Sequence, residues 1–438
     1  MTTLRIAGGR YLTPEMVVET GDVLVDRGTG KIISVGEVED GEETLDATGC
    51  VVMPGLVNAH THAAMTLLRG YADDEPLESW LREHVWPAEA QLTAEDIRAG
   101  TDLALCEMIR SGTTAFCDMY FEEPAVAAAV EEAGLRALLG HGIVTVGKDE
   151  EGVAAELEEG LGFAREYRNA STEESVEGES WVRTACMPHS LTTVAEDAIE
   201  ECVAAAKDLD VPIHYHANET EGEVEPIVSE RGIRPLEYAD DRGLLGDRAL
   251  LAHGVHLDDR EISLLAERGT GVVHCPASNM KLASGMAPIQ DLLDAGVTVG
   301  LGTDGAASNN DLDLFDELRD AAMVGKVAAD DASAVAAPDV LEMATRGGAE
   351  LLGFDSGRIE PGRSADLAVV DFSASHLTPV HDLVSHLVYA ARGSDVRHTI
   401  CNGEVLMRDR ELTTLDEDAI RTEAQKRAMG LAKRAESG

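Results

Sequence analysis

Eight short apolar segments, separated by longer and more acidic helix-like segments, constrain the fold of this chain more than any other feature. Alternation of apolar strands with helical patterns is typical of βα units, and successive βα units build a parallel sheet. Eight such strands most economically form a closed (β/α)8 barrel. The expected strands cover residues 54–62, 113–119, 136–144, 182–190, 211–219, 249–257, 271–279 and 298–305.

The two ends of the chain follow a different pattern, in which short strands and turns replace the alternation with helices. We expect residues 1–52 and 366–438 to form one small composite β-sandwich domain, with an exposed helix in its last 25 residues. Residues 53–365 then form the catalytic α/β barrel, in which residues 150–180 are predicted to be a helix followed by a loop.

The charge of the chain excludes several classes of partner. Its 438 residues carry 82 acidic and 35 basic side chains, a net charge of −47 that is spread along the chain. Such a field repels nucleic acids and anionic membranes, and it suits a surface in concentrated salt, which screens the self-repulsion. The seven cysteines form no CxxC pair, so we expect reduced thiols. Because "MTTLRIAGGRYL" is no signal peptide and no apolar run could span a membrane, we expect a cytoplasmic protein of a high-salt cell.

Polar, chemically capable side chains stand at the ends of nearly all the expected strands. In "VVMPGLVNAHTH", His60 and His62 follow an apolar run two residues apart, so they point to the same side of a strand end. The C-terminal strand ends of a (β/α)8 barrel surround one mouth, where active sites form. The other strand-end residues are His141, His189, His214, His216, Glu219, His253, His256, His274, Asn279 and Asp304.

Histidines and a carboxylate around one mouth predict a metal site. Neutral imidazoles with a carboxylate suit zinc or another borderline divalent ion. The expected ligands of one divalent ion, taken to be Zn2+, are His60, His62, His216 and Asp304. They leave one position for a water molecule, whose pKa the ion lowers toward about 7.

The remaining strand-end histidines divide by their sequence context. His214 and His216 share a strand face, but only His216 is followed by an acid three residues later. We therefore expect His216 to be the ligand, Glu219 to be a proton shuttle and His214 to be structural. His256 and His274 are expected to be packing or surface residues.

The end of the fourth strand favours one metal ion over two. A two-metal site in this kind of barrel usually needs a carbamylated lysine there. This chain has His189 instead, and none of its seven lysines is at a matching strand end. A single ion favours deamination of an aromatic ring over hydrolysis of an amide or a phosphoester.

Longer stretches carry a resemblance to a known family. They are "PGLVNAHTHAAMTLLRGYADD", "WLREHVWPAEAQLT", "CDMYF", "PHSL", "HANET", "AHGVHL", "CPASNMKLASGMAPI" and "LGTDGAASNNDLDLF", and they extend over most of the chain. The chain resembles the 5-methylthioadenosine/S-adenosylhomocysteine deaminases, in the chlorohydrolase-like branch of the amidohydrolase superfamily. The HxH pair and the "GTDGAASNN" block are typical of the branch, and the "WL…PAE" segment of adenosine-type deaminases.

The resemblance implies roles for the matching positions. It implies the metal ligands already expected, hydrolytic deamination at C6 of an adenine nucleoside, and a homo-oligomer. Glu89 would bind the ribose hydroxyls, and His189 would contact the substrate. Glu219 would face the purine ring and protonate N1, while His253 would lie beside the attacked carbon. Asp304 would take a proton from the attacking water.

Two further assignments have structural alternatives. From the residues alone, Glu89 is an exposed helix residue, and only the resemblance gives it a role in binding. Trp80 is as consistent with ordinary helix packing as with an apolar wall of the substrate pocket.

One departure from the family leaves the 5′-substituent of the nucleoside open. His141 stands where relatives that accept S-adenosylhomocysteine can carry an arginine, and the following loop, "DEEGVAAE", has no arginine either. Arginine suits a carboxylate because it offers a paired, permanently charged donor. Binding of the homocysteine carboxylate is therefore in doubt, whereas 5-methylthioadenosine, 5′-deoxyadenosine and adenosine are less affected.

Two other functions remain as alternatives. A deaminase or chlorohydrolase of the same branch would act on guanine, a pyrimidine or a triazine. A non-catalytic barrel that serves as a binding protein would lack metal ligands, whereas all four candidates and the acid Glu219 are present here.

Overall fold

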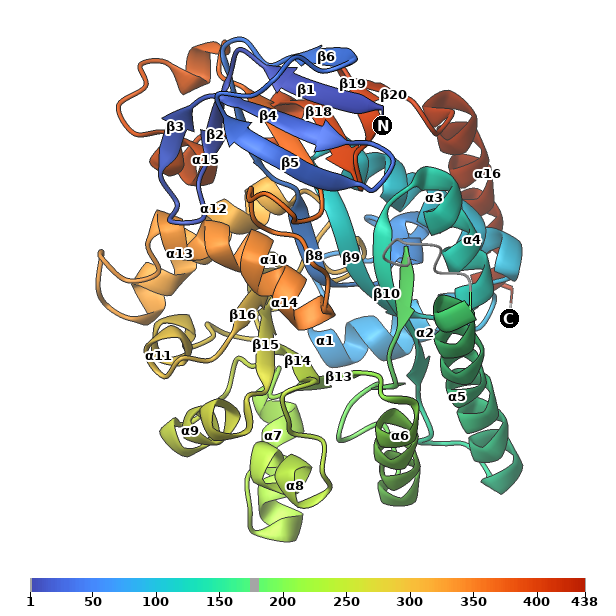
Figure 1. Cartoon of the computed structure of the whole chain (residues 1–438). Coiled ribbons are helices and arrows are strands. Elements are labelled where there is room, and N and C mark those ends of the chain that lie inside the picture. Colours follow the sequence, from blue (N-terminus) through green and yellow to red (C-terminus); the bar gives the residue numbers. More distant parts are fainter. Residues whose placement is uncertain (1, 174–180, 438) are drawn as a thin grey trace.

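All eight expected strands are present, and together they form one barrel. The computed structural model describes residues 2–173 and 181–437 (Figure 1). The fourth strand is split in two by an irregular segment. The barrel strands are β8 (Leu56–Thr61), β9 (Thr113–Tyr120), β10 (Arg136–Ile143), β11 (Val182–Thr184), β12 (Met187–Pro188), β13 (Ile213–Ala217), β14 (Ala249–His253), β15 (Gly271–His274) and β16 (Val299–Leu301).

Backbone hydrogen bonds close the barrel on both sides. The strands pair in parallel in two sets, in the orders β11-β10-β9-β8 and β13-β14-β15-β16. The two sets meet where the His216 amide donates to the His189 carbonyl at 2.8 Å, and where the Asp304 amide donates to the His60 carbonyl at 3.1 Å. At the second junction, a Cβ atom on Gly302 would lie 2.7 Å from the His60 carbonyl oxygen, so this close approach requires glycine. The (β/α)8 barrel prediction is confirmed.

Amphipathic helices cover the outside of the barrel (Figure 1). Their starts follow ordinary capping rules; for example, Thr93 accepts from the Asp96 amide while the Asp96 carboxylate accepts from the Thr93 amide. The helices around the barrel are α3 (Ala94–Arg110), α4 (Glu123–Ala133), α5 (Glu150–Glu173), α6 (Glu196–Leu209), α7 (Glu221–Arg231), α8 (Pro235–Asp241), α9 (Asp259–Arg268), α10 (Pro276–Lys281), α11 (Ile289–Asp294), α12 (Leu314–Ala328), α13 (Ala337–Glu342) and α14 (Gly348–Leu352).

Four short helical segments follow the first barrel strand along the chain. They are η1 (Ala63–Leu68), α1 (Leu77–Ser79), η2 (Trp80–Val85) and α2 (Trp86–Glu89). The helix expected after residue 150 is α5, and the loop expected up to residue 180 lies outside the described residues.

Two sheets lie outside the barrel, and one of them combines strands from both ends of the chain. A four-stranded sheet has the order β5-β4-β1-β6, and a seven-stranded sheet has the order β20-β19-β18-β17-β7-β2-β3. In the second sheet, Val52 pairs with Val369. The strands are β1 (Thr3–Ala7), β2 (Arg10–Leu12), β3 (Val18–Thr20), β4 (Asp22–Asp26), β5 (Lys31–Gly36), β6 (Glu43–Asp46), β7 (Cys50–Pro54), β17 (Leu367–Asp371), β18 (Val396–Cys401), β19 (Glu404–Arg408) and β20 (Glu411–Leu412).

A separate apolar cluster fills the space between these sheets. It joins Leu4 and Val23 from the N-terminal strands to Val369 and Ile400 from the C-terminal ones, and all four are fully buried. The division of the chain into domains at residues 52 and 366 stays a prediction.

The final helix differs from its prediction. α16 (Glu417–Ala435) is exposed along one face only, because its other face packs on α3 (Figure 1). Ala424 and Leu431 are buried there, and the Arg434 guanidinium donates to the Asp96 carboxylate at 2.5 Å. Small apolar residues at helical spacing were the signal for this contact.

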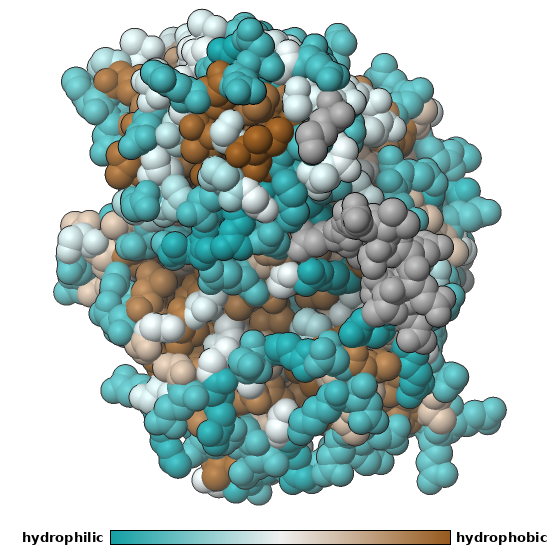
Figure 2. Space-filling view, viewed as in Figure 1, coloured by the Kyte–Doolittle hydropathy of each residue, from teal (hydrophilic) through white to brown (hydrophobic). Residues whose placement is uncertain are grey.

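The surface agrees with the acidic composition. Hydrophilic residues form most of the outline of the molecule in Figure 2, and apolar residues lie mainly in the recesses between them. Within residues 2–173 and 181–437, none of the helices combines the length and the apolar character needed to cross a bilayer.

Candidate active site

Three strand ends bring the expected metal ligands together. The Nε2 atoms of His62 and His60 lie 3.2 Å and 3.6 Å from Oδ1 of Asp304. The rings of His60 and His216 have their centroids 4.8 Å apart. Ligand atoms within 4.8 Å of one another occur in two overlapping groups, one with His60, His62 and Asp304 and one with His60, His216 and His253.

The second ring nitrogen of each of these histidines already has a partner. Nδ1 of His62 donates to the Met119 carbonyl at 2.5 Å, and Nδ1 of His216 donates to the His189 carbonyl at 2.8 Å. These bonds place a proton on Nδ1 of each ring, so Nε2 carries a free lone pair in neutral His216, and in His62 once the proton shared with Asp304 has left. Metal-binding histidines are typically oriented in this way.

His60 receives the same support from a second histidine. Its Nδ1 lies 2.8 Å from Nε2 of His214, whose own Nδ1 donates to the Leu250 carbonyl at 3.1 Å. His214 is therefore the acceptor, and the proton between the two rings belongs to His60. The Nε2 atom of His60 is buried without a hydrogen-bond partner among the described residues, which fits a site built for a metal ion.

Asp304 presents one carboxylate oxygen to the cluster. Its Oδ2 accepts from the hydroxyls of Ser278 at 2.6 Å and Ser308 at 2.8 Å, while Oδ1 faces the histidines. Burial alone would raise the pKa of Asp304, but the neighbouring His60 and His62 side chains outweigh it and hold the pKa well below its usual range. The side chain is therefore an anion that suits a cation.

The surrounding histidines differ in charge. Burial lowers the pKa of His60 to about 4 and that of His189 to about 3, so both rings are neutral at neutral pH. Burial acts in the same direction on His62, but its hydrogen bond to Asp304 raises the pKa to about 9. A metal ion would take the place of the proton that His62 shares with Asp304.

The backbone is strained where these strands end. Asn218, His253 and Asp304 have positive φ angles of 55°, 75° and 59°. Such conformations cost about 1–3 kcal/mol each in residues other than glycine, and they cluster at functional sites. Here they turn the chain so that Glu219, His253 and Asp304 face one space.

Glu219 and His253 form a second pair beside the cluster. Oε2 of Glu219 lies 3.8 Å from Nε2 of His253, and Nδ1 of His253 donates to Oδ1 of Asn279 at 2.9 Å. Oε1 of Glu219 accepts from the Ser284 hydroxyl at 3.3 Å. Burial raises the pKa of the Glu219 carboxyl, which suits a group that must hold and release a proton.

Glu89 is placed near the cluster through Tyr120. Oε1 of Glu89 accepts from the Tyr120 hydroxyl at 2.7 Å, and the Tyr120 ring lies 6.0 Å from the His62 ring. Burial raises the pKa of Glu89 to about 7, although the Tyr120 hydrogen bond opposes it. Glu89 is partly buried rather than an exposed helix residue, and Trp80 is 5% exposed within the apolar core.

His141 is occupied by two acids. Its Nδ1 lies 2.9 Å from Oε1 of Glu123, and its Nε2 lies 3.5 Å from Oε1 of Glu156. Although burial lowers the pKa of His141, these hydrogen bonds raise it to about 10, so the ring is a cation. Lys148 also pairs with Glu156, so the positive charges here are already balanced by carboxylates.

Of the other two strand-end histidines, His274 is buried and His256 is half-buried. His274 is 1% exposed, and burial lowers its pKa to about 3. His256 donates from Nε2 to the Ser284 carbonyl at 2.7 Å. The quoted motifs contain Tyr120, Ser278 and Ser284, but no role was predicted for these three residues.

Comparisons with known proteins agree with this geometry. A family model described as "Amidohydrolase family" matches residues 51–406. The chain is 65% identical over 436 residues to a 5-methylthioadenosine/S-adenosylhomocysteine deaminase of Natronomonas pharaonis, with 100% of both chains covered. It is 46% identical over 420 residues to a 5′-deoxyadenosine deaminase of Methanosarcina mazei, covering 96% of this chain and 95% of that one. The solved structure of an adenosine deaminase from Xanthomonas campestris with bound zinc is 39% identical, with a TM-score of 0.92 and 98% of each chain covered.

A closed βα barrel with a histidine and aspartate cluster at its mouth defines a class of metal-dependent hydrolases. Within that class, this chain belongs to the amidohydrolase family, because the family match covers most of its length.

Proposed function

We propose that this chain hydrolyses the C6 amino group of adenine nucleosides, with 5-methylthioadenosine as its main substrate and a 5-methylthioinosine product. Adenosine and 5′-deoxyadenosine are further substrates. The observation that carries this proposal is one buried constellation, in which His60, His62 and Asp304 face the acid Glu219 and the neighbouring His253. The names of relatives at 65% and 46% identity support the same substrate class.

The proposed ligands of one zinc ion are His60, His62, His216 and Asp304. Three imidazoles with supported Nδ1 atoms and a buried carboxylate are the donors that zinc prefers. When bound, the ion polarises a water molecule and makes it acidic enough to attack at neutral pH. A relative with a TM-score of 0.92 was solved with bound zinc.

The proton steps are assigned to three side chains. Asp304 accepts a proton from the attacking water at Oδ1, because its Oδ2 is already occupied by two serine hydroxyls. Glu219 gives a proton to N1 of the purine, which makes C6 a better electrophile, and then helps transfer a proton to the departing amine. His253, 3.8 Å from Glu219, stabilises the new oxygen at C6. Ammonia leaves, and a hypoxanthine nucleoside remains.

The remaining assignments concern recognition. Glu89 accepts hydrogen bonds from the ribose hydroxyls, and His189, whose ring lies 4.6 Å from that of His216, contacts the substrate. Burial of Trp80 in the apolar core supports a packing role, and only its inner edge is proposed as a pocket wall. The paired state of His141 and Lys148 argues against tight binding of the homocysteine carboxylate, so S-adenosylhomocysteine is the weaker substrate.

The test is a substrate panel in concentrated KCl with added zinc. The ultraviolet spectrum and release of ammonia would be followed for 5-methylthioadenosine, 5′-deoxyadenosine, S-adenosylhomocysteine, adenosine, guanine and cytosine, and release of chloride for a chlorotriazine. We expect turnover of the first two, with a lower kcat/KM for S-adenosylhomocysteine. Turnover of guanine, cytosine or the triazine alone would replace the proposal with the alternative deaminase or chlorohydrolase, and metal-free, inactive protein would favour a binding role.

The cellular setting is proposed from charge. A net charge of −47 fits a homo-oligomer in a high-salt cytoplasm, where counter-ions screen the repulsion between acidic surfaces. Light scattering in concentrated KCl measures the oligomeric state. The same measurement after dialysis against dilute buffer tests the dependence on salt. A folded, unchanged particle in dilute buffer would contradict the high-salt assignment.

A further inference from the structure

One short segment of the chain forms hydrogen bonds with both Glu219 and His253. Residues 279–285 comprise the end of α10 and the loop that follows it. At its start, Oδ1 of Asn279 accepts from Nδ1 of His253 at 2.9 Å. Near its end, the Ser284 hydroxyl donates to Oε1 of Glu219 at 3.3 Å. The segment therefore contacts both Glu219 and His253.

We propose that Ser284, held by His256, is a positioning residue that fixes the rotation of the Glu219 carboxyl group. This inference rests on the proposed function, because it gives Glu219 the proton transfer to the substrate. The terminal torsion of a glutamate is broad, so the plane of an unrestrained carboxyl group rotates over a wide range. The Ser284 hydroxyl occupies Oε1, which leaves Oε2, the oxygen 3.8 Å from His253, to face the reacting ring.

No other side chain among the described residues donates a hydrogen bond to this carboxyl group. The amide of Glu219 is held separately, by Oε2 of Glu223 at 3.0 Å, and this contact orients the backbone rather than the carboxyl. Ser284 is 7% exposed and Glu219 is 7% exposed, so bulk water has little access to replace the hydroxyl.

His256 holds the serine in place from the neighbouring strand end. Its Nε2 donates to the Ser284 carbonyl at 2.7 Å. Its amide donates to the Asn218 carbonyl at 2.8 Å, and the Asn218 side chain donates to the His256 carbonyl at 3.1 Å. Asn218 directly precedes Glu219, so His256 is hydrogen-bonded both to Ser284 and to the residue beside Glu219.

The backbone of the segment also resists a shift. Gly285 has a φ of 136°, and a Cβ atom there would lie 2.8 Å from Cγ1 of Val255 and 3.5 Å from Nε2 of His256. The chain next to Ser284 is therefore packed directly on the residues around His256, and glycine is needed for this contact.

The first test compares four variants of the full chain, loaded with zinc in concentrated KCl. Ser284→Ala is expected to lower kcat for 5-methylthioadenosine about tenfold with KM changed less than about twofold, because a hydrogen bond to an ionisable group is lost. Ser284→Thr keeps the hydroxyl and should stay within about threefold of the parent. His256→Phe should give a loss between these two. Ser263→Ala, which removes an exposed helix hydroxyl, is the matched control and should change nothing.

A double-mutant cycle separates positioning from general damage. If Ser284 acts through Glu219, Ser284→Ala should change the residual kcat of Glu219→Gln less than about twofold. An equal loss in both backgrounds, or a Ser284→Ala enzyme within about twofold of the parent, would overturn the proposal.

A crystal structure of Ser284→Ala gives a readout that needs no substrate. The Glu219 carboxyl is expected to rotate or to occupy two orientations, while the metal ligands stay in place. An unchanged single orientation would overturn the positioning role whatever the kinetics. Absence of nucleoside turnover by the parent chain would instead overturn the proposed function, and the crystal structure would still decide the role of Ser284.

Discussion

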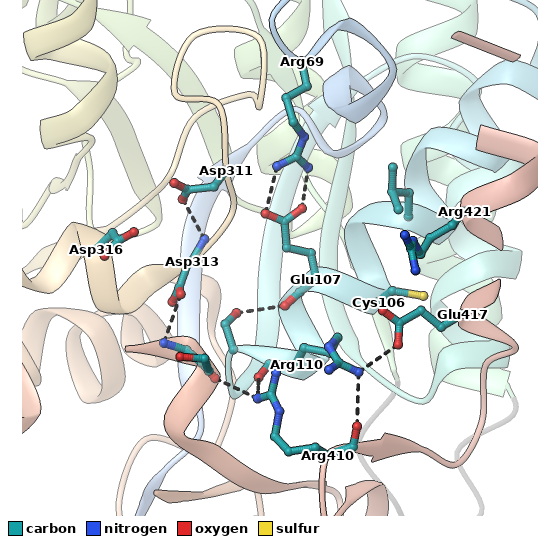
Figure 3. Close-up of a pocket in the computed structure, with 14 residues that line it drawn as sticks. Arg69, Cys106, Glu107, Arg110, Asp311, Asp313, Asp316, Arg410, Glu417 and Arg421 are labelled. Atoms are coloured by element: carbon teal, nitrogen blue, oxygen red, sulfur yellow. Dashed lines mark hydrogen bonds and ion pairs between the residues drawn. The ribbon is translucent and has the colours of Figure 1, made fainter. Parts of the chain in front are cut away.

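Two clusters of titratable side chains in this molecule differ in how their charges are used. The first is the histidine and carboxylate cluster inside the barrel mouth. The second lines an open cavity of about 480 Å³ between α3, the start of α12 and the C-terminal strands (Figure 3). In the second cluster, arginines and acids pair with each other, whereas in the first a buried imidazole nitrogen has no partner among the described residues.

The pairing in the cavity is extensive. Arg69 pairs with Glu107, and Arg110 donates to Glu417 at 2.8 Å (Figure 3). Arg410 donates to the carbonyls of Arg110, Gly393 and Val396 at 2.6–2.8 Å. These bonds join the helices of the barrel to the C-terminal strands, which is a structural task.

The contrast teaches that unsatisfied groups, rather than charge or hollowness, mark the functional site. The Nε2 atom of His60 is buried at a cost that none of the described residues offsets. A bound ion and a substrate would offset it.

Removing a ligand should abolish the function of the barrel cluster. His62→Ala is expected to lose zinc and to lower kcat/KM by about 10³-fold or more, because a bound metal ion supplies several kcal/mol of transition-state stabilisation. Metal analysis and nucleoside turnover in concentrated KCl measure both effects. His381→Ala, at an exposed position, is the control. Full zinc content and activity in His62→Ala would refute the ligand assignment.

Neutralising the acid should separate chemistry from metal binding. Glu219→Gln is expected to keep its zinc and to lose about 10²–10⁴-fold in kcat, because an amide cannot transfer the proton to N1. Glu225→Gln, exposed on the helix that follows, should retain parent kinetics. A Glu219→Gln enzyme with more than a tenth of the parent kcat would mean that another group delivers the proton.

Recognition of the ribose should depend on pH through Glu89. Burial raises its pKa to about 7, so the carboxyl is protonated below that value and becomes a poorer hydrogen-bond acceptor. We expect KM for 5-methylthioadenosine to rise about tenfold from pH 8 to pH 6. Tyr120→Phe removes a hydrogen bond that lowers this pKa, so its KM should begin to rise at a higher pH. A KM profile identical in Glu89→Gln and the parent would exclude Glu89.

Disrupting the surface cavity should have the smallest effect. Arg110→Ala removes an ion pair whose side chains are each about one-third exposed, so the free energy of unfolding should fall by only about 0.5–1 kcal/mol. kcat/KM should stay within about twofold of the parent. Denaturant unfolding in concentrated KCl and nucleoside kinetics measure these changes. A large loss of activity in Arg110→Ala would give the cavity a functional role.

Much of the fold could be predicted because strand and helix patterns are local. Apolar runs of strand length alternate with acidic helix-like segments, and the eight segments expected as strands coincide with β8 to β16. The end of α16 shows the limit of this approach. Its polar surface predicts exposure, and only the presence of α3 beside it explains why Leu431 is buried.

The candidate site follows the same division. The positions of His60, His62, Glu219 and Asp304 at strand ends could be predicted, since parallel strands direct their C-terminal ends to one mouth. The partners that assign each proton could not. His214 meets His60 across 154 positions of the chain, and Ser284 meets Glu219 across 65.

Periodicity and motif spacing are local properties of the chain. They were therefore sufficient to predict the barrel, the amidohydrolase family and the set of chemically capable residues. Only the tertiary structure decided which nitrogen of each histidine is free, which oxygen of Asp304 faces the cluster, and that His141 is neutralised by Glu123 and Glu156. Those properties depend on hydrogen bonds between distant strand ends, and such bonds exist only once the barrel has closed.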